Sequence, residues 1–171
     1  AVPMRPERIC KEITELLPGD GVLVFSPYFP TYLPNIERRG ARGVLLRVGQ
    51  RMWNLLLEDA ALGGKAKAAL IKRLPLSRRR KAILELLGRL IGAQPGDITV
   101  HSLDLDLLVV DHASPAAAGQ QASRPICFVT QGLIRESLFW ATGQNLDIEE
   151  TSCKATGHDT CEFKVVTGRV A

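Results

Sequence analysis

Apolar residues recur with a helical period in four stretches of the chain. Positions three or four residues apart lie on one face of a helix. The pattern predicts helices over residues 6–17, about 35–59, 77–91 and 124–142. Ser77 is the predicted N-cap of the third of these helices. The fourth is apolar on two sides, which predicts that it is buried between two layers.

Four shorter stretches have the character of strands. They are residues 21–25, 98–112, 146–152 and 161–166, and the last two are predicted to form a closing hairpin. Within residues 98–112 the alternation slips near His101 and Ser102, which predicts a bulge or bend in a single strand. The elements together predict an α+β fold, in which an antiparallel sheet of about four strands packs against helices.

The helix predicted over residues 35–59 has one apolar stripe, with Trp53 lying beside it. Glycines at positions 40, 43 and 49 would let another element, or a ligand, approach the helix closely. Trp53 is a candidate for a dimer contact or for a pocket. The stripe consists of Val44, Leu45, Val48, Met52, Leu55 and Leu56.

Length and composition indicate one ordinary globular domain. The chain has 171 residues, of which 46% are hydrophobic and 23% charged, enough for a sizeable core. We therefore expect a single domain over residues 1–171. No apolar run approaches the roughly 18 residues that span a bilayer, and no secretion signal is visible. Four cysteines are too few for a disulfide scaffold, so we expect a reduced, cytoplasmic setting.

A basic segment, residues 65–81, stands out within a stretch that lacks acids. Residues 60–84 contain eight Lys and Arg and no Asp or Glu. Such a segment can bind a protein partner or another anionic surface, and it can equally be a solvated face or a linker. No aromatic residues lie between the bases, which argues against single-stranded nucleic acid as the partner.

The candidate chemistry lies in the last third of the chain. Glu150 and Cys153 are three positions apart, and Gly157 allows the chain to reverse so that Cys161 returns beside them. Cys127, at the start of the fourth helix, would complete a tetrahedron. Three sulfurs and one oxygen suit a structural zinc ion. Two alternatives remain: Cys127 as a buried core thiol, and Cys153 and Cys161 as a disulfide.

The same residues carry a resemblance to a known family. The stretch E-x-x-C-x-A-x-G-x-x-x-C-x-F over residues 150–163 resembles the C-terminal signature of the 4-vinyl-reductase-like domain. That family includes a protein of bacteriochlorophyll synthesis and the phenol- and toluene-sensing domains of bacterial activators. It shares a fold with small subunits of the transport-particle tethering complex. The resemblance covers roughly residues 20–167.

The resemblance implies a ligand set and a set of functions. In the phenol sensors three Cys and one Glu hold a structural zinc, and Cys127, Glu150, Cys153 and Cys161 match them. The implied function is non-catalytic binding of a hydrophobic small molecule, such as an aromatic compound, a tetrapyrrole or a lipid, by a homodimer. The candidate pocket residues are Phe25, Tyr28, Trp53, Phe128, Leu133, Ile134 and Trp140.

One departure and two alternatives qualify that hypothesis. By spacing from Cys127, the histidine and tryptophan that hold phenol in the sensors fall near Arg78 and Asp106, which argues against phenol itself. The chain could instead be a scaffold, tethering or assembly subunit with an interface around Trp53. It could also be an accessory protein of chlorophyll biosynthesis. Neither a G-x-G-x-x-G motif nor a P-loop is present, which favours a protein that is not an enzyme.

Overall fold

The computed structural model describes residues 42–60 and 62–168. Its helices are α3 (Arg42–Asp59), α4 (Leu62–Ile71), α5 (Leu76–Ile91) and α6 (Phe128–Thr142). Its strands are β1 (Ile98–Leu103), β2 (Asp106–Asp111), β3 (Asp147–Ser152) and β4 (Cys161–Val166), with a 3₁₀ turn, η2, at Lys154–Thr156. The predicted helix 6–17 and strand 21–25, with Phe25 and Tyr28, lie outside the described residues.

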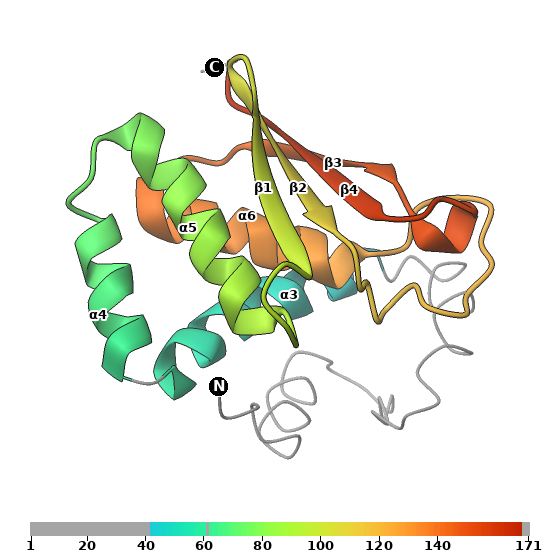
Figure 1. The fold of residues 1–171 in the computed structure, drawn as a ribbon, viewed down its shortest axis with the longest axis horizontal. Helices are drawn as coiled ribbons and strands as arrows, with labels where there is room; N and C mark the ends of the chain where they lie inside the picture. The colour runs from blue at the N-terminus through green and yellow to red at the C-terminus, as the bar shows by residue number, and fades with distance from the viewer. Residues whose placement is uncertain (1–41, 61, 169–171) are drawn as a thin grey trace.

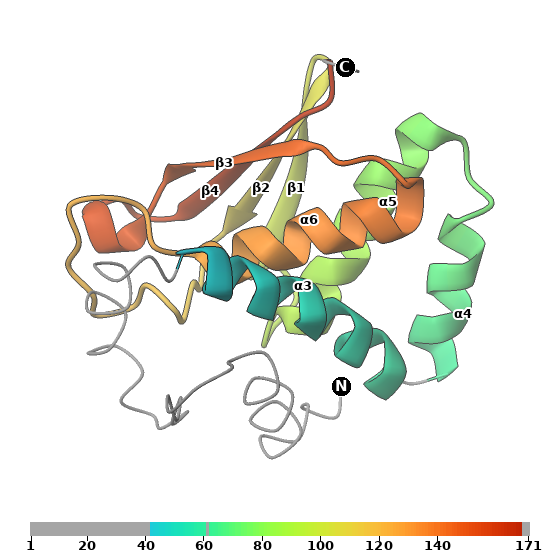
Figure 2. The same ribbon diagram turned by 180° about the vertical axis from the view of Figure 1, so that it is seen from behind.

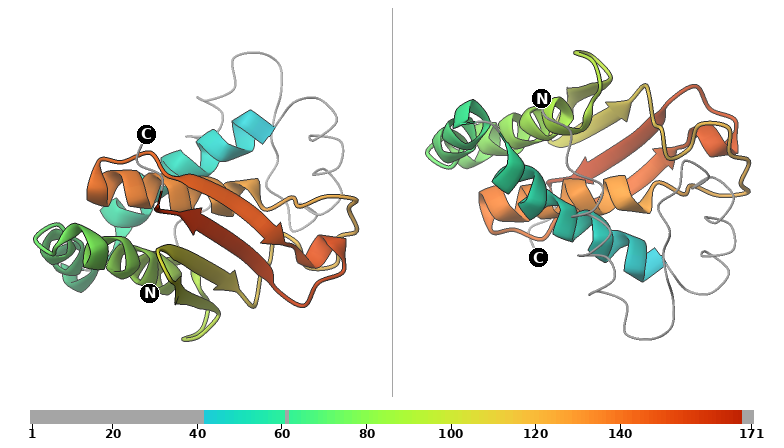
Figure 3. Two further views of the ribbon diagram at one scale, coloured as in Figure 1. Left: turned by 90° about the horizontal axis from the view of Figure 1, so that it is seen from above. Right: turned by 90° about the horizontal axis from the view of Figure 1, so that it is seen from below.

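The four strands form one antiparallel sheet in the order β1-β2-β4-β3. The last strand in the sequence, β4, therefore lies between β2 and β3. The helices gather on one side of the sheet (Figure 1 and Figure 2). Seen from above, no described helix covers the opposite face (Figure 3). The α+β prediction, with an antiparallel sheet of four strands, is confirmed.

Helix α6 lies directly under the sheet, and α3 packs against its other side (Figure 2). This arrangement explains why α6 is apolar on two sides. The two helices touch at glycines. A Cβ atom on Gly49 would overlap the Val129 carbonyl oxygen, and one on Gly132 would overlap that of Leu46. Glycine at position 49 thus permits the close approach that the sequence predicts.

Trp53 is part of the core and not a residue beside it. Its side chain is fully buried, whereas Val44, Met52 and Leu56 from the predicted stripe are only partly buried. The Trp53 ring meets the edge of Trp140 at a centroid distance of 5.8 Å and an interplanar angle of 70°. The buried face of α3 is therefore rotated from the predicted stripe, because α6 packs at Gly49 and draws Trp53 inward.

The prediction of one bent strand over residues 98–112 was wrong. The stretch forms the hairpin β1–β2, in which Ile98 pairs with Asp111 and Leu103 with Asp106. The turn is Asp104-Leu105, where Asp104 adopts a positive φ of 49°. Asp tolerates this left-handed conformation better than most residues, so a turn without glycine forms here. The slip in alternation reflects the two strands of a hairpin.

The segment from 62 to 91 also differs in detail from the prediction. Helix α4 was not predicted, and its Ala66, Ala68 and Ala69 are strong helix formers that offset Gly63 and Gly64. Helix α5 begins at Leu76 after Pro75, so Ser77 lies inside the first turn and is not the N-cap. Among the described helices, none has both the length and the apolar character needed to cross a membrane.

Candidate functional site

Four elements converge on the cysteine cluster. Cys127 is the N-cap residue of α6, Glu150 lies on β3, Cys153 precedes η2, and Cys161 begins β4. The turn between Cys153 and Cys161 closes at Gly157, whose φ of 94° is in the left-handed region. Pairing of β3 with β4 then brings Cys161 back beside Cys153.

The four side chains that the sequence predicts as metal ligands lie together. The Sγ atoms of Cys127 and Cys153 are 3.8 Å apart, those of Cys127 and Cys161 3.5 Å, and those of Cys153 and Cys161 3.8 Å. With a Glu150 carboxylate oxygen, the ligand atoms all lie within 4.8 Å of one another. All three cysteines are buried and free, so Cys153 and Cys161 do not form a disulfide here.

These distances fit a tetrahedral zinc site. Two sulfurs bound to one zinc at about 2.3 Å, with tetrahedral angles, would be separated by about 3.8 Å. Three thiols and one carboxylate also match the donor preference of zinc in closed sites. Cys127, Glu150, Cys153 and Cys161 would hold the ion. It would then tie the start of α6 to the β3–β4 hairpin.

Cys161 accepts two hydrogen bonds that the sequence did not predict. The Ser114 hydroxyl donates to Cys161 Sγ at 2.9 Å, and the Lys154 amide donates to the same sulfur at 3.3 Å. On the other side of the cluster the Cys127 amide donates to Glu150 Oε2 at 2.9 Å. Ser114 begins a segment whose composition is typical of a flexible loop. Only Asp111, three residues earlier, indicates an ordered turn there.

The three thiols of the cluster differ in pKa. Hydrogen bonds from the Cys127 thiol, the Ser114 hydroxyl and the Lys154 amide lower the pKa of Cys161 to about 6. Burial raises the pKa of Cys153 to about 11. The hydrogen bond to Cys161 and burial raise the pKa of Cys127. Cys161 is thus the most acidic of the three thiols, and binding a metal would release protons from the other two.

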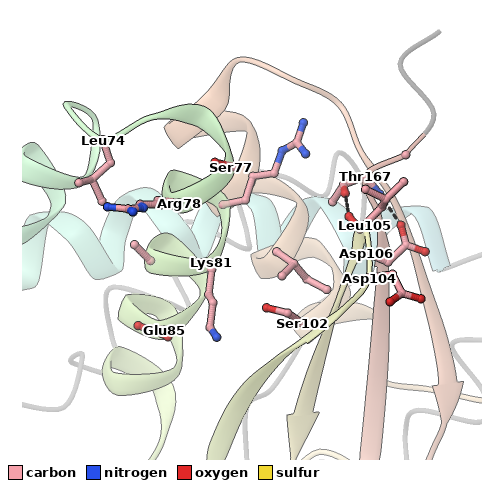
Figure 4. Close-up of a pocket in the computed structure, with 14 residues that line it drawn as sticks. Leu74, Ser77, Arg78, Lys81, Glu85, Ser102, Asp104, Leu105, Asp106 and Thr167 are labelled. Atoms are coloured by element: carbon pink, nitrogen blue, oxygen red, sulfur yellow. Dashed lines mark hydrogen bonds between the residues drawn. The ribbon is translucent and has the colours of Figure 1, made fainter.

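A cavity of about 580 Å³ lies between α5 and the β1–β2 hairpin (Figure 4). Arg78 and Asp106 both line it. Its other lining residues are Leu74, Ser77, Arg80, Lys81, Ala82, Glu85, Ser102, Asp104, Leu105, Leu107, Thr167 and Gly168.

Asp106 is already engaged within the cavity wall. The Thr167 amide donates to Asp106 Oδ1 at 2.9 Å, and Lys164 Nζ lies 3.3 Å from Oδ2. The hydrogen bond from Thr167 and the ion pair with Lys164 hold the pKa of Asp106 below its usual range. The Thr167 hydroxyl also donates to the Leu105 carbonyl, so the chain after β4 is fastened to the tip of the β1–β2 hairpin.

The predicted pocket residues do not gather around this cavity. Trp53, Leu133 and Ile134 are buried in the core. Phe128 borders a second cavity, of about 420 Å³, beside Glu149 and Glu150. Trp140 borders another, of about 400 Å³, beside Leu55 and Leu57 on α3. The position of α6 between the sheet and α3 explains the difference, because its apolar faces are used for packing.

The basic segment is structured, and its bases have different partners. Lys72 Nζ lies 3.7 Å from the centre of the Trp140 ring, and Arg79 donates to the carbonyls of Leu74 and Ala141. Arg80 donates to Gln144 Oε1 at 2.7 Å. Lys65, Lys67 and Arg73 are exposed. Part of the segment therefore supports the packing of α5 against its neighbours.

Comparison with solved structures shows a shared fold. The phenol-responsive sensory domain of the transcription activator PoxR, solved with phenol, is 14% identical, with a TM-score of 0.50 over 96% of this chain and 90% of that one. An H-NOX domain from Shewanella oneidensis in the Fe(II)CO state is 15% identical, with a TM-score of 0.52 over 94% and 87%. A mutant H-NOX protein from the same organism, in the Fe(II) state, is 15% identical, with a TM-score of 0.51 over 96% and 88%.

At these identities the likeness concerns the fold alone. No curated protein sequence matches the chain. One family model does match, that of the 4-vinyl-reductase domain, and it covers residues 109–167. This region contains the end of β2 together with α6, β3 and β4, and with them all four residues of the cysteine cluster. The resemblance indicated by the motif around Glu150, Cys153 and Cys161 is therefore confirmed: residues 109–167 of this chain match the 4-vinyl-reductase domain family.

Proposed function

We propose that this chain is a small-molecule-binding domain without catalytic activity, and that its ligand occupies the cavity between α5 and the β1–β2 hairpin. The cavity itself carries the proposal. Its volume of about 580 Å³ lies within the roughly 300–1,000 Å³ of small-molecule pockets, as do the volumes of three other cavities of the described residues, at about 400, 420 and 730 Å³. The apolar side chains on both of its walls favour this one. Apolar side chains from both walls, including Leu74 and Leu107, line it together with nine polar or charged residues.

The relatives support this function. PoxR, which is similar in fold, is described as phenol-responsive, and its sensory domain was solved with phenol. By the resemblance, the phenol-holding positions of such sensors fall near Arg78 and Asp106, where this chain has neither the histidine nor the tryptophan. We therefore propose a hydrophobic ligand other than phenol.

We further propose that the cysteine cluster binds a structural zinc ion. Four protein ligands would leave no position open for a substrate, so the ion would stabilise the fold and take no part in a reaction. The sulfur separations of 3.5–3.8 Å support this role. The metal site and the cavity then have separate tasks, one structural and one in ligand binding.

The cavity can be tested by blocking it from the strand wall. Ser102 lines the cavity and is exposed, whereas His101 precedes it on β1 and points to the opposite face of the sheet. Two fluorescent probes with the same aromatic skeleton report occupancy: 8-anilinonaphthalene-1-sulfonate and N-phenyl-1-naphthylamine. We expect saturable binding of at least one probe at one site per chain, lost in Ser102→Trp and retained in His101→Trp.

The result that would overturn the proposal is equally clear. If neither probe binds the 171-residue chain, or if both tryptophan variants bind as the parent does, the cavity is not a ligand site. Native mass spectrometry of the same protein, compared with its denatured mass, reports in one spectrum a co-purified ligand, one zinc per chain and the homodimer that the resemblance implies.

A further inference from the structure

Three bases from two turns of α5 line the cavity together. Arg78, Arg80 and Lys81 all belong to its wall, and the first turn of α5 contains no acidic residue. The N-terminal end of a helix adds positive potential of its own. Figure 4 shows Arg78 and Lys81 on the α5 side, across from Ser102 and Asp104 on the hairpin. The α5 end of the cavity is therefore electropositive.

These bases have unused hydrogen-bonding capacity. Within the part of the chain that the structure describes, the side chains of Arg78 and Lys81 form no hydrogen bond or ion pair. Arg80 uses one nitrogen to hold Gln144, while its Nε is buried and lacks a hydrogen-bond partner among the described residues. A buried donor without a partner is costly, and an acceptor on a ligand would remove that cost.

The carboxylates around the cavity do not fully offset the positive potential of these bases. Asp106 is engaged by Lys164 and the Thr167 amide. Asp104, Glu85 and Arg78 are exposed, where water and salt screen their charges, whereas Arg80 and Lys81 are half-buried and screened less. Leu74, Leu105 and Leu107 supply an apolar surface next to the bases. A ligand that contacts both the bases and this apolar surface has a compact negative group joined to a hydrocarbon skeleton.

We propose that the cavity selects a small amphipathic organic anion over a neutral molecule of the same skeleton, with Arg78 and Lys81 holding the negative group. This inference rests on the proposed function and specifies the class of ligand. The anion can be aromatic or aliphatic, and both share the chemistry that the cavity recognises: a negative group beside a hydrocarbon surface.

The two probes named above test the charge preference directly, because they differ by one sulfonate. We expect the anionic probe to bind the parent at least about tenfold more tightly than the neutral probe, as charge-assisted hydrogen bonds imply. The double variant Arg78→Gln, Lys81→Gln should lose about tenfold or more in affinity for the anionic probe and keep its affinity for the neutral one. Competition by 1-naphthoate and by decanoate separates an aromatic from an aliphatic anion.

A matched control removes one Arg and one Lys elsewhere. Arg89 and Lys67 are exposed and lie outside the cavity lining. The double variant Lys67→Gln, Arg89→Gln should bind both probes as the parent does. Circular dichroism and Tm establish that each variant is folded, and Arg80 is left intact because it anchors Gln144.

The outcomes separate the two proposals. Equal affinity of the parent for both probes, or equal losses in the two double variants, would overturn the anion preference while leaving a ligand cavity in place. Binding of neither probe would overturn the proposed function, and the anion preference with it.

Discussion

Asp111 and Ser114 prepare the cysteine cluster from outside its four ligands. Asp111 Oδ1 accepts hydrogen bonds from the amides of Ala113 and Ser114, at 3.1 and 2.7 Å. Ser114 has a positive φ of 38°, which is unfavourable for most residues, so these bonds stabilise the conformation that directs its hydroxyl at Cys161. The buried Asp111 carboxylate thereby helps to position the Cys161 sulfur without contacting it.

Removing one thiol should destabilise the domain if the cluster holds zinc. We expect Cys153→Ser to release the metal and to lower Tm by several degrees, because a tetrahedral site loses a ligand and its binding free energy contributes to folding. Calorimetry and metal analysis measure the two effects. The neighbouring Ser152→Ala, which removes only a weak contact to Glu162, is the control and should change neither. A metal-free parent with an unchanged melting curve in Cys153→Ser would refute the metal site.

Ser114→Ala should weaken the site without removing a ligand. Outer hydrogen-bond partners of metal ligands typically contribute about 10–100-fold in affinity. We therefore expect a loss of that order for Zn²⁺, while the absorption spectrum of the Co²⁺-substituted protein remains tetrahedral. Ser123→Ala, in the exposed part of the same loop, is the matched control. An unchanged affinity would mean that the bond from Ser114 to Cys161 has no role in metal binding.

At the scale of elements, the contact between α3 and α6 organises the core. Gly49 and Gly132 bring the two backbones close enough that neither position has room for a Cβ atom. The approach allows Trp53, from α3, to pack edge-on against Trp140 of α6. One pair of glycines thus determines how two long helices bury their aromatic residues.

Two alanine substitutions in the same helix should have opposite effects. Gly49→Ala should lower the free energy of unfolding by about 2 kcal/mol or more, because the new methyl group meets the Val129 carbonyl and α6 must shift. Gly43 is exposed, with only the end of the Arg47 side chain nearby. Gly43→Ala should therefore raise the free energy of unfolding by up to about 1 kcal/mol through helix propensity. Urea unfolding measures both. A similar effect of the two substitutions would contradict the tight contact.

Local sequence patterns predicted the elements whose signals are local. The closing hairpin and α6 follow from alternation, periodicity and Gly143. The turn at Asp104 was missed because no glycine marks it, and α4 was missed because two glycines obscure its alanines. The metal cluster was predictable since three of its four residues lie within twelve positions. The cavity was not, because α5, the β1–β2 hairpin and residues 167–168 meet only in the folded protein.

At the scale of the whole molecule, the proposed metal site would make the stability of the fold depend on pH and on metal supply. One zinc would join the start of α6, which packs against α3 and α5, to β3 and β4 of the sheet. Chelation should therefore act on the entire domain and not on one loop. A fall in Tm on adding a strong chelator, reversed by Zn²⁺, is the expected observation.

Zinc affinity should rise with pH. The metal binds thiolates, and burial raises the pKa of Cys153 to about 11, while the pKa of Cys127 also lies above its usual value. Cys161, with its pKa lowered to about 6, is already ionised at neutral pH. Two protons should thus leave on binding between about pH 7 and 8, and the logarithm of the binding constant should rise by about two per pH unit. Competition with a chromophoric chelator, corrected for its own protonation, measures this slope; a slope near zero would contradict it.

The position of β4 in the sheet also has a consequence for synthesis. Because β4 lies between β2 and β3, the four-stranded sheet cannot form until the ribosome has released β4, which ends at Val166. At roughly 5–20 residues per second, the nascent chain waits several seconds after β2 emerges before its partner arrives. During that time β2 exposes an unpaired edge, which is where we expect a chaperone to bind the growing polypeptide.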